Sequence, residues 1–286
     1  MRIALILVPY HLGHEGLAMG GGPDALLNAA ADALAGAAHD VEVLRIERKD
    51  RAANEIGASF ELVSRVAEAV ADAVAREAFP LVLAGNCLTS VGIVAGLGRD
   101  VGVVWLDAHA DFNTPDTSLS GFADGMGLAI LTGAGWQALR ELIPGYRVVP
   151  EENVVLAGVR DVDPPERDRL DSSAIEVLAP IEAAERLDAA LDLLHERVSD
   201  VHLHLDLDVL DPSAGRANEY ASPGGLSADE VERVVAAVGE RCALRSAALT
   251  AYDPAADQDG RIPAPAGRFM ERIAAAAQAR LGARAG

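Results

Sequence analysis

Short apolar runs rich in Val, Ile and Leu alternate along the chain with longer segments in which apolar residues recur at helical spacing. Runs of about four to eight apolar residues between polar or turn-forming residues are typical of buried strands, and longer amphipathic segments are typical of helices. The predicted strands are 3–8, 41–46, 81–84, 101–106, 154–159, 201–207 and 244–252. The predicted helices are 23–38, 60–79, 183–198, 227–238 and 267–281, with one more between 84 and 101.

The alternation of strands with helices predicts an α/β fold with three layers, αβα, in which the middle layer is a mostly parallel sheet. A chain of 286 residues, 50% of them hydrophobic, can bury a full core, and we find no internal repeat, low-complexity tract or linker in it. We therefore expect a single domain over residues 1–286. In open α/β sheets, ligands bind beyond the carboxyl ends of the strands, so the polar residues that follow each apolar run are the candidates for a ligand site.

Two of these strand ends carry acidic residues at every second position. Asp107, His109 and Asp111 follow the strand at 101–106, and Asp206 and Asp208 lie at the end of the strand at 201–207. In an extended chain, residues i, i+2 and i+4 project to one face, so the members of each array point together. The sequence therefore predicts four carboxylates and an imidazole at one end of the sheet.

Several carboxylates in one buried pocket repel one another and cannot all stay ionised without compensation. Divalent cations supply that compensation, and carboxylate-rich ligation with an imidazole suits a pair of Mn²⁺ ions bridged by Asp. Each motif alone is equally consistent with loop and helix-cap residues. The two motifs together, at matching strand ends, favour a metal centre.

The same segments resemble the sequence blocks of the arginase and ureohydrolase family. The stretch 107–115, followed by Ser118, Ser120 and Gly121, is similar to the family signature. The stretches 204–212 and 158–166 are similar to two further blocks, and the blocks occur in the family's order over residues 3–254. The sequence is identified as a member of this family, which implies the arginase-like fold and hydrolysis of a linear amidine C–N bond.

The resemblance implies a role for each acidic residue of the two arrays. Asp107 and Asp206 match the carboxylates that bridge two Mn²⁺ ions. His109 and Asp208 match the ligands that complete one ion, and Asp111 matches a ligand of the other. Asp208 is also placed to accept a proton from the attacking water.

A second set of positions matches the residues that bind the substrate's amino-acid group. Asn113, Ser118 and Ser120 correspond to the positions that hold an α-carboxylate, and Asp163 corresponds to the acidic partner of the α-amino group, with Glu166 in the same block. Agmatinases, which bind a decarboxylated substrate, lack this Asn-Thr-Pro and Ser-x-Ser pattern. The resemblance therefore implies an intact, small-molecule amino acid as substrate.

The sequence departs from arginases at two positions that concern the metal and the proton. Cys87 stands where the family has a metal-binding His. A thiolate can bind a divalent ion but is softer than Mn²⁺ prefers, and the alternative is a buried structural cysteine beside an emptied metal site. Asp124 stands where arginases carry a His that shuttles protons, and it is the candidate acid in this chain, alongside a metal-bound water or solvent.

The third departure concerns the guanidinium. Ala251 stands where arginases place a Glu that grips this group, although Glu219 or Asp253 could reach the same space. These departures favour a less basic substrate, such as an Nω-hydroxyguanidine, whose oxygen withdraws electrons. They resemble the Nω-hydroxy-L-arginine amidinohydrolases of D-cycloserine biosynthesis, which release ornithine and hydroxyurea. The open alternatives are arginase or another guanidino-acid hydrolase, such as a formiminoglutamase, and a metal-depleted, non-catalytic binding homologue.

Two histidines precede the second acidic array on the same strand. His202 and His204 share the strand face of Asp206 and Asp208 but lie further from the strand end. A hydrogen-bonded core position is expected for His202. His204 is a candidate to support a metal ligand from behind.

Composition narrows the class of partner. The chain has 44 Asp and Glu against 24 Lys and Arg, for a net charge of −20, which disfavours nucleic acids and anionic membranes. The apolar runs are too short to span a bilayer, the start does not resemble a signal peptide, and the two cysteines exclude a disulfide framework. We expect a cytoplasmic enzyme, either a monomer or a homo-oligomer.

Overall fold

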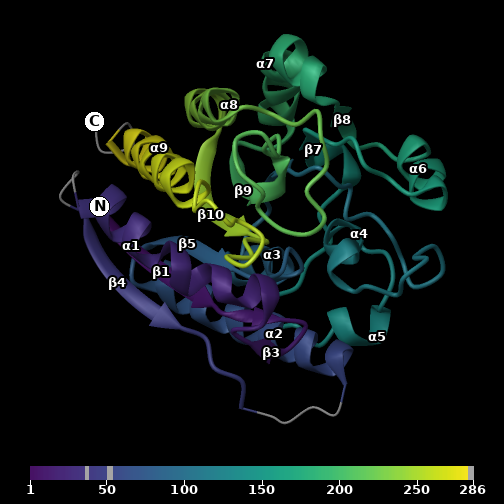
Figure 1. Cartoon of the computed structure of the whole chain (residues 1–286), viewed down its shortest axis with the longest axis horizontal. Helices are drawn as coiled ribbons and strands as arrows, with labels where there is room; N and C mark the ends of the chain where they lie inside the picture. Colours follow the sequence, from purple (N-terminus) through teal and green to yellow (C-terminus); the bar gives the residue numbers. More distant parts are fainter. Residues whose placement is uncertain (36–38, 50–53, 283–286) are drawn as a thin grey trace.

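Figure 1 shows the computed structural model of the chain, which describes residues 1–35, 39–49 and 54–282. Within these residues, the centre of the fold is an eight-stranded sheet in which every neighbouring pair of strands runs parallel. In order across the sheet, the strands are β4 (Asp40–Arg45), β1 (Arg2–Val8), β5 (Phe79–Ala84), β10 (Ala243–Thr250), β9 (Asp200–Asp206), β6 (Gly102–Leu106), β7 (Val154–Ala157) and β8 (Glu176–Leu178). The prediction of a mostly parallel sheet is confirmed.

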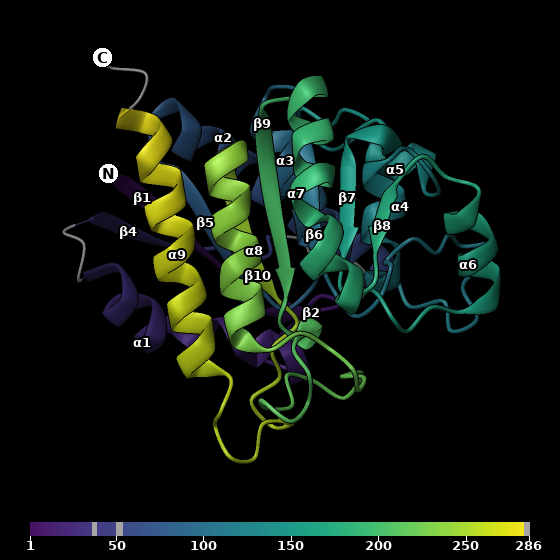
Figure 2. The same ribbon diagram turned by 90° about the horizontal axis from the view of Figure 1, so that it is seen from above.

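Helices cover both faces of this sheet, as the view in Figure 2 shows. One face carries α1 (Gly22–Ala35), α7 (Pro180–Arg197), α8 (Ala228–Arg241) and α9 (Pro263–Gly282). The other carries α2 (Glu55–Ala75), α3 (Thr89–Gly96) and α4 (Gly127–Leu131). The remaining short elements are the hairpin strands β2 (Tyr10–His11) and β3 (His14–Glu15), the helices α5 (Gln137–Arg140) and α6 (Pro164–Asp171), and the 3₁₀ turns η1 (Ala18–Gly21), η2 (Asp124–Met126), η3 (Glu151–Asn153) and η4 (Leu207–Val209). The three-layer prediction is confirmed.

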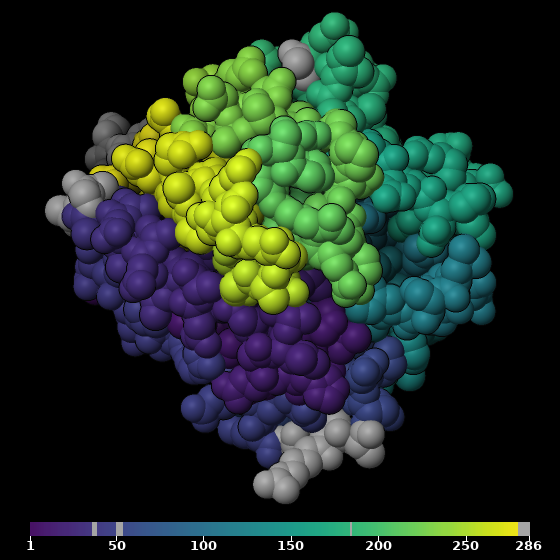
Figure 3. All heavy atoms as spheres, viewed as in Figure 1, coloured from purple at the N-terminus to yellow at the C-terminus, as the bar shows by residue number. Residues whose placement is uncertain are grey.

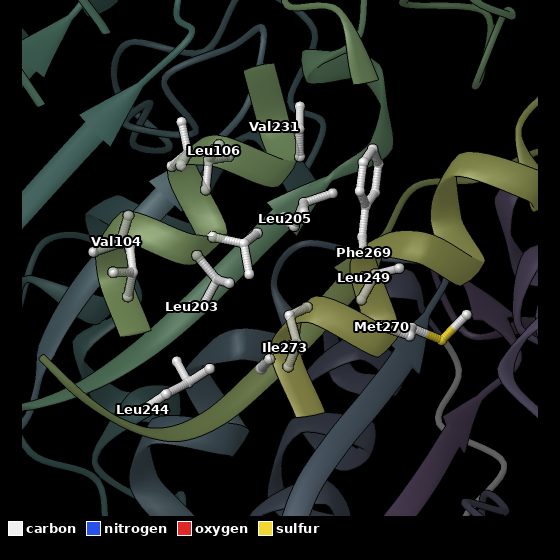
Figure 4. Packing of buried hydrophobic residues seen from close by; sticks show 14 of the residues in the cluster. Val104, Leu106, Leu203, Leu205, Val231, Leu244, Leu249, Phe269, Met270 and Ile273 are labelled. Carbon is white, nitrogen blue, oxygen red and sulfur yellow. The ribbon is translucent and has the colours of Figure 1, made fainter. Parts of the chain in front are cut away.

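Alternate residues of the central strands enter two separate cores. In β1, Ile3 and Leu5 join the core under α1 and α9, whereas Ala4 and Ile6 join the core under α2 and α3. Figure 4 shows the first core, where Leu203, Leu205 and Leu249 lie against Phe269 and Ile273 of α9. Because parallel strands with both faces covered need apolar side chains on both, the central strands β1, β5 and β6 are nearly continuous apolar runs in the sequence.

Several element boundaries differ from the prediction for local reasons. The helix predicted at 60–79 begins at Glu55, because the side chain of Asn54 caps it by accepting the N–H of Gly57 at 2.8 Å. It ends at Ala75, and the backbone of Glu77, with φ of 56°, turns the chain into β5. Residues 36–38 of the helix predicted at 23–38 lie outside the described residues.

The short elements were not predicted, because their sequences carry no clear period. The edge strand β8 has only three residues, one of them Glu176, and α6 is mostly charged. One predicted strand also differs at its end. The strand predicted at 201–207 ends one residue early, at Asp206, because the side chain of Asp206 accepts the N–H of Asp208 and starts a 3₁₀ turn.

The strand order brings four carboxyl ends together. Thr250 at the end of β10 pairs with Ala84 at the end of β5 and with Asp206 at the end of β9, and β6 lies on the other side of β9. The loops that follow these strands therefore meet at one edge of the sheet. In Figure 3, surfaces drawn in purple, green and yellow adjoin one another, although they come from distant parts of the sequence. In the part of the chain that the structure describes, no helix is both long enough and apolar enough for a bilayer.

Because α2 and α3 pack closely, one methyl group added between them should lower the stability of the fold. A Cβ added at Gly92 of α3 would lie 2.2 Å from the carbonyl oxygen of Val63 in α2. We expect Gly92→Ala to lower the free energy of unfolding by about 1–3 kcal/mol through overpacking, as measured by urea denaturation.

The matched control is Gly267→Ala in α9, where the nearest atom to an added Cβ lies at an ordinary 3.5 Å. This variant should be neutral or up to about 1 kcal/mol more stable, because Ala favours helices over Gly. Equal effects of the two substitutions would contradict the close approach of α2 to α3.

Candidate active site

A cavity of about 420 Å³ opens at the edge of the sheet where the loops after β5, β6, β7 and β9 meet. Its lining includes Cys87, His109, Asp111, Asn113, Ser118, Ser120, Asp124, Asp163, Glu166, Asp206, Asp208, Asn218, Glu219, Tyr220 and Ala251. Asp107 is 1% exposed and lies beside this lining, within contact of His109. The structure therefore brings all of the predicted site residues to one place.

The imidazole of His109 lies between two carboxylates. Its Nδ1 is 3.3 Å from Oδ1 of Asp107 and 3.4 Å from Oδ2 of Asp208. Burial opposes the charged imidazole, but hydrogen bonds to Asp107 and Asp208 raise the pKa of His109. For Asp208, burial is outweighed by the hydrogen bond from His109, and its pKa is lowered. Without a cation, a charged His109 thus provides part of the compensation that these carboxylates need.

Two residues that sequence reasoning missed hold these carboxylates. Asn218 Nδ2 donates to Oδ2 of Asp208 at 3.1 Å, and Trp105 Nε1 donates to Oδ2 of Asp107 at 3.0 Å. Trp105 lies within the apolar run of β6, and Asn218 lies in a loop whose sequence has no period. Only their positions in the folded chain connect them to the cluster.

Two groups of possible metal-ligand atoms lie next to each other. One atom from each of Cys87, Asp107, Asp111 and His204 lies within 4.8 Å of the others, and Asp107, His109 and Asp208 form a similar group. Cys87 Sγ also donates to Oδ2 of Asp206 at 2.9 Å. The described residues can therefore hold cations in two adjacent groups that share Asp107.

Burial makes this cluster unfavourable when it carries only its own charges. Burial first, and neighbouring carboxylates second, raise the pKa of Asp111, Asp206 and the Cys87 thiol well above their usual values. Oδ2 of Asp111 is buried without a hydrogen-bond partner among the described residues. Thiolate, imidazole and carboxylate are all metal-binding groups, so an orphaned acceptor in this setting fits a bound cation.

The loop that carries Cys87 is held by glycine and by Asp124. A Cβ at Gly85 would lie 2.3 Å from the carbonyl oxygen of Tyr10, so only glycine allows this approach. Asp124 Oδ2 accepts from Asn86 Nδ2 at 2.6 Å, and its Oδ1 accepts from the N–H of Leu88 at 2.9 Å. Burial raises the pKa of Asp124 to about 7. The predicted acid thus also fastens both neighbours of Cys87.

The loop after β6 presents three hydrogen-bond donors at the mouth of the cavity. Asn113 Oδ1 accepts from the hydroxyl of Thr117 at 2.9 Å, which leaves its amide N–H groups for a ligand. The hydroxyl oxygens of Ser118 and Ser120 accept backbone N–H groups of the same loop at 2.9 and 3.2 Å. Their O–H groups are then free to donate, and three donors suit a carboxylate.

Two acidic residues line the cavity near α6. Asp163 precedes this helix and makes no side-chain cap hydrogen bond, so its carboxylate is available to a cation. Glu166 accepts the N–H of Phe112 at 2.7 Å, and burial raises its pKa. Glu166 therefore positions the segment between Asp111 and Asn113 in addition to lining the cavity.

Ala251 lines the cavity with a left-handed backbone, at φ of 60°, and its carbonyl oxygen accepts from Asn218. Glu219 lines the same cavity, whereas Asp253 is not among the described lining residues. Phe122 and Tyr220, which sequence reasoning missed, also line it, with ring centroids 5.6 Å apart. Of the two acidic alternatives for the Ala251 position, the geometry favours Glu219.

A carboxylate-rich cluster that can hold adjacent cations, at the carboxyl edge of a parallel sheet and beside donors for a small polar ligand, defines a metal-dependent α/β hydrolase. Residues 1–277 match the family model described as Arginase family. The chain belongs to the arginase family, whose members are metal-dependent hydrolases that act on guanidino C–N bonds. The predicted family and class of enzyme are confirmed.

Similar proteins agree with this assignment. An arginase from Bacillus caldovelox is 32% identical over 288 aligned positions, covering 94% of this chain and 96% of that protein. The solved structure of arginase from Bacillus caldovelox matches with a TM-score of 0.86 at 31% identity, over 95% of this chain and 97% of that one. An arginase structure from Bacillus subtilis matches with a TM-score of 0.86 at 29% identity, over 96% and 98% of the two chains. The similarity thus spans nearly the whole fold.

The buried cluster predicts how the stability of the metal-free protein depends on pH. Folding raises the pKa of Asp111, Asp206, Asp124 and His109, so the folded chain holds protons that the unfolded chain has released. The stabilisation from these groups is complete below their unfolded pKa values, the lowest of which is about 4, and is lost as the pH rises through about 7 and above. We expect metal-free Asp111→Asn to exceed wild type in free energy of unfolding by about 1–3 kcal/mol at pH 8, and by little near pH 4, in urea titrations after chelation.

The control is Asp116→Asn, which removes a charge from an exposed position of the same loop. It should leave the pH dependence unchanged. A benefit of Asp111→Asn that is the same at both pH values, or that Asp116→Asn shares, would contradict the electrostatic strain in the cluster.

Proposed function

We propose that this chain hydrolyses Nω-hydroxy-L-arginine to ornithine and hydroxyurea, with two Mn²⁺ ions in the carboxylate cluster. The observation that carries the proposal is the composition of the cavity lining. It includes hydrogen-bond donors suited to an amino-acid group, but it has Ala251 where arginases place a Glu that binds the guanidinium. In the same proposal, residues 1–286 form one domain that acts in the cytoplasm, as a monomer or homo-oligomer.

The head group of the substrate is held by the loops after β6 and β7. The three donors of Asn113, Ser118 and Ser120 bind the α-carboxylate, and Asp163 binds the α-ammonium. Neutral donors for the α-carboxylate and one carboxylate for the α-ammonium, at fixed positions, orient the amino acid, so that its side chain extends towards the cluster. Glu166 contributes by holding the segment that carries Asn113.

The reaction needs a water that loses a proton and a nitrogen that gains one. Bound cations supply the Lewis acidity that lowers the pKa of a water at the cluster. Asp208, held by Asn218, accepts the proton of that water. The bond from the guanidino carbon to the δ-nitrogen of ornithine breaks, this nitrogen takes a proton, and the oxygen of water becomes the carbonyl oxygen of hydroxyurea. Asp124 is the proposed proton donor, because it lines the cavity and is close to the Cys87 loop.

The hydroxyl group explains why this substrate suits the cavity. An Nω-hydroxyguanidine is less basic than a guanidine, because the attached oxygen withdraws electrons, so its neutral form is easier to reach. The methyl group of Ala251 offers no charge to hold a guanidinium cation. A neutral hydroxyguanidine loses less from this absence than L-arginine does.

L-Arginine hydrolysis is the second candidate. The similar proteins are named arginases, and Glu219 lines the cavity as an alternative partner for a guanidinium. The relative rates on the two substrates separate the candidates.

The test is a side-by-side assay of Nω-hydroxy-L-arginine, L-arginine, agmatine and formiminoglutamate with Mn²⁺. We expect kcat/KM for Nω-hydroxy-L-arginine to exceed that for L-arginine at least about tenfold, which corresponds to about 1.4 kcal/mol. Agmatine should be a poor substrate, because it has no α-carboxylate for the three donors. Equal or better turnover of L-arginine would overturn the assignment, and wild-type protein that binds no Mn²⁺ and turns over none of the four would support a non-catalytic homologue.

Ala251→Glu tests the reason for this preference. The new carboxylate faces the guanidino group, and a charge-assisted hydrogen bond contributes about 1.5–3 kcal/mol, so kcat/KM for L-arginine should rise about 10- to 100-fold relative to the hydroxylated substrate. Ala251→Gln has a similar size without the charge and should change the ratio little. A similar gain in both variants would show that size, and not charge, controls the choice of substrate.

A further inference from the structure

His204 is a buried imidazole at the inner side of the candidate metal cluster. It lies on β9 two residues before Asp206, on the same strand face, and it is fully buried. One of its ring nitrogens belongs to the group of atoms within 4.8 Å that Cys87, Asp107 and Asp111 complete. The neighbouring His202, on the same face and also fully buried, is in neither group of the described residues.

The ring of His204 is fixed in orientation. Trp105 of β6 stacks on it, with centroids 3.5 Å apart and an interplanar angle of 13°. The same indole donates to Asp107, so the stack is tied to the cluster. Nδ1 of His204 is hydrogen-bonded to Ser90 Oγ at 2.8 Å. A ring held on one face and at one nitrogen can present only its other nitrogen in one direction.

That nitrogen, Nε2, lies beside the hydroxyl of Thr250, which lies between it and Cys87. Nε2 of His204 is 3.4 Å from Oγ1 of Thr250, and the same hydroxyl is 3.3 Å from Sγ of Cys87. Histidines that bind metals donate their other ring N–H to a fixed acceptor, which sets the tautomer. Ser90 can take this part, and the lone pair of Nε2 then faces the cluster.

We propose that His204 binds the cation held by Cys87, Asp107 and Asp111, an inference that rests on the metal centre of the proposed function. Cys87 stands where the family has a metal-binding His, so this strand end lacks an imidazole. In the proposal, His204 of β9 supplies the imidazole in its place. This site has one thiolate, one imidazole and two carboxylates, whereas the adjacent site has His109, Asp208 and Asp107. The softer ligand set favours Co²⁺ or Zn²⁺ over Mn²⁺ at the first site more than at the second.

The experiment is a titration of the metal-free chain with Co²⁺, followed by absorption. A thiolate-to-cobalt charge-transfer band reports the ion at Cys87, and the visible d–d bands report its coordination. In His204→Gln we expect the affinity of this ion to fall more than about 100-fold, beyond the 10- to 100-fold loss typical of residues that only support a ligand. At saturation, the d–d bands should still differ from those of wild type.

The matched control is His202→Gln, on the same strand face and equally buried. It removes a partner of Ser90 Oγ at 3.2 Å but leaves the bond between Ser90 and His204 possible. Its Co²⁺ spectrum and affinity should be those of wild type. A His204→Gln spectrum identical to that of wild type, or equal losses in the two variants, would overturn the proposal.

A second measurement uses the unmutated chain, so that a folding defect cannot hide the answer. With ¹⁵N-labelled histidine and two equivalents of Zn²⁺, we expect ring-nitrogen resonances of both His109 and His204 to shift to metal-bound positions. A shift of His109 alone would overturn the inference and leave the proposed function intact. If both shift but the chain does not hydrolyse Nω-hydroxy-L-arginine, the proposed function fails and the assignment of His204 stands.

Discussion

Like charges buried at the edge of a parallel sheet are the constraint on which the rest of this structure depends. Asp107, Asp111, Asp206 and Asp208 come from two strand ends, and all four are at least nine-tenths buried. Water cannot compensate their charges there, so the surroundings must. His109 does so for two of them, and a bound cation accounts for the orphaned oxygen of Asp111.

The scaffold is organised to keep that cluster rigid. Both faces of the sheet are covered, so each strand that ends in the site is fixed by two cores. The Cys87 loop is pinned on one side by the close approach of Gly85 to β2 and on the other by Asp124. Metal sites need ligands held to within a fraction of an ångström, and rigid strand ends supply this better than long loops do.

Three departures from the arginase pattern, Cys87, Asp124 and Ala251, line one cavity. Cys87 would be a softer ligand than a histidine, Asp124 is bonded to the loop that carries Cys87, and Ala251 adds no charge to a lining that also includes Glu219. The proposed donors for an amino-acid group, Asn113, Ser118 and Ser120, lie in the loop after β6, and the N–H of Asn113 donates to the carbonyl oxygen of Gly125, next to Asp124.

The sequence by itself determined the layers, the parallel sheet and the two acidic arrays, because alternation along a strand and the order of strands and helices are local properties. It also located Asn113, Ser118 and Ser120 through their motif. Only the tertiary structure decided that β10 lies between β5 and β9, which places Thr250 between Cys87 and His204. The parts played by Asn218 and Trp105, and the bonds of Asp124 to the Cys87 loop, depend on contacts between residues distant in the chain, which no local pattern encodes.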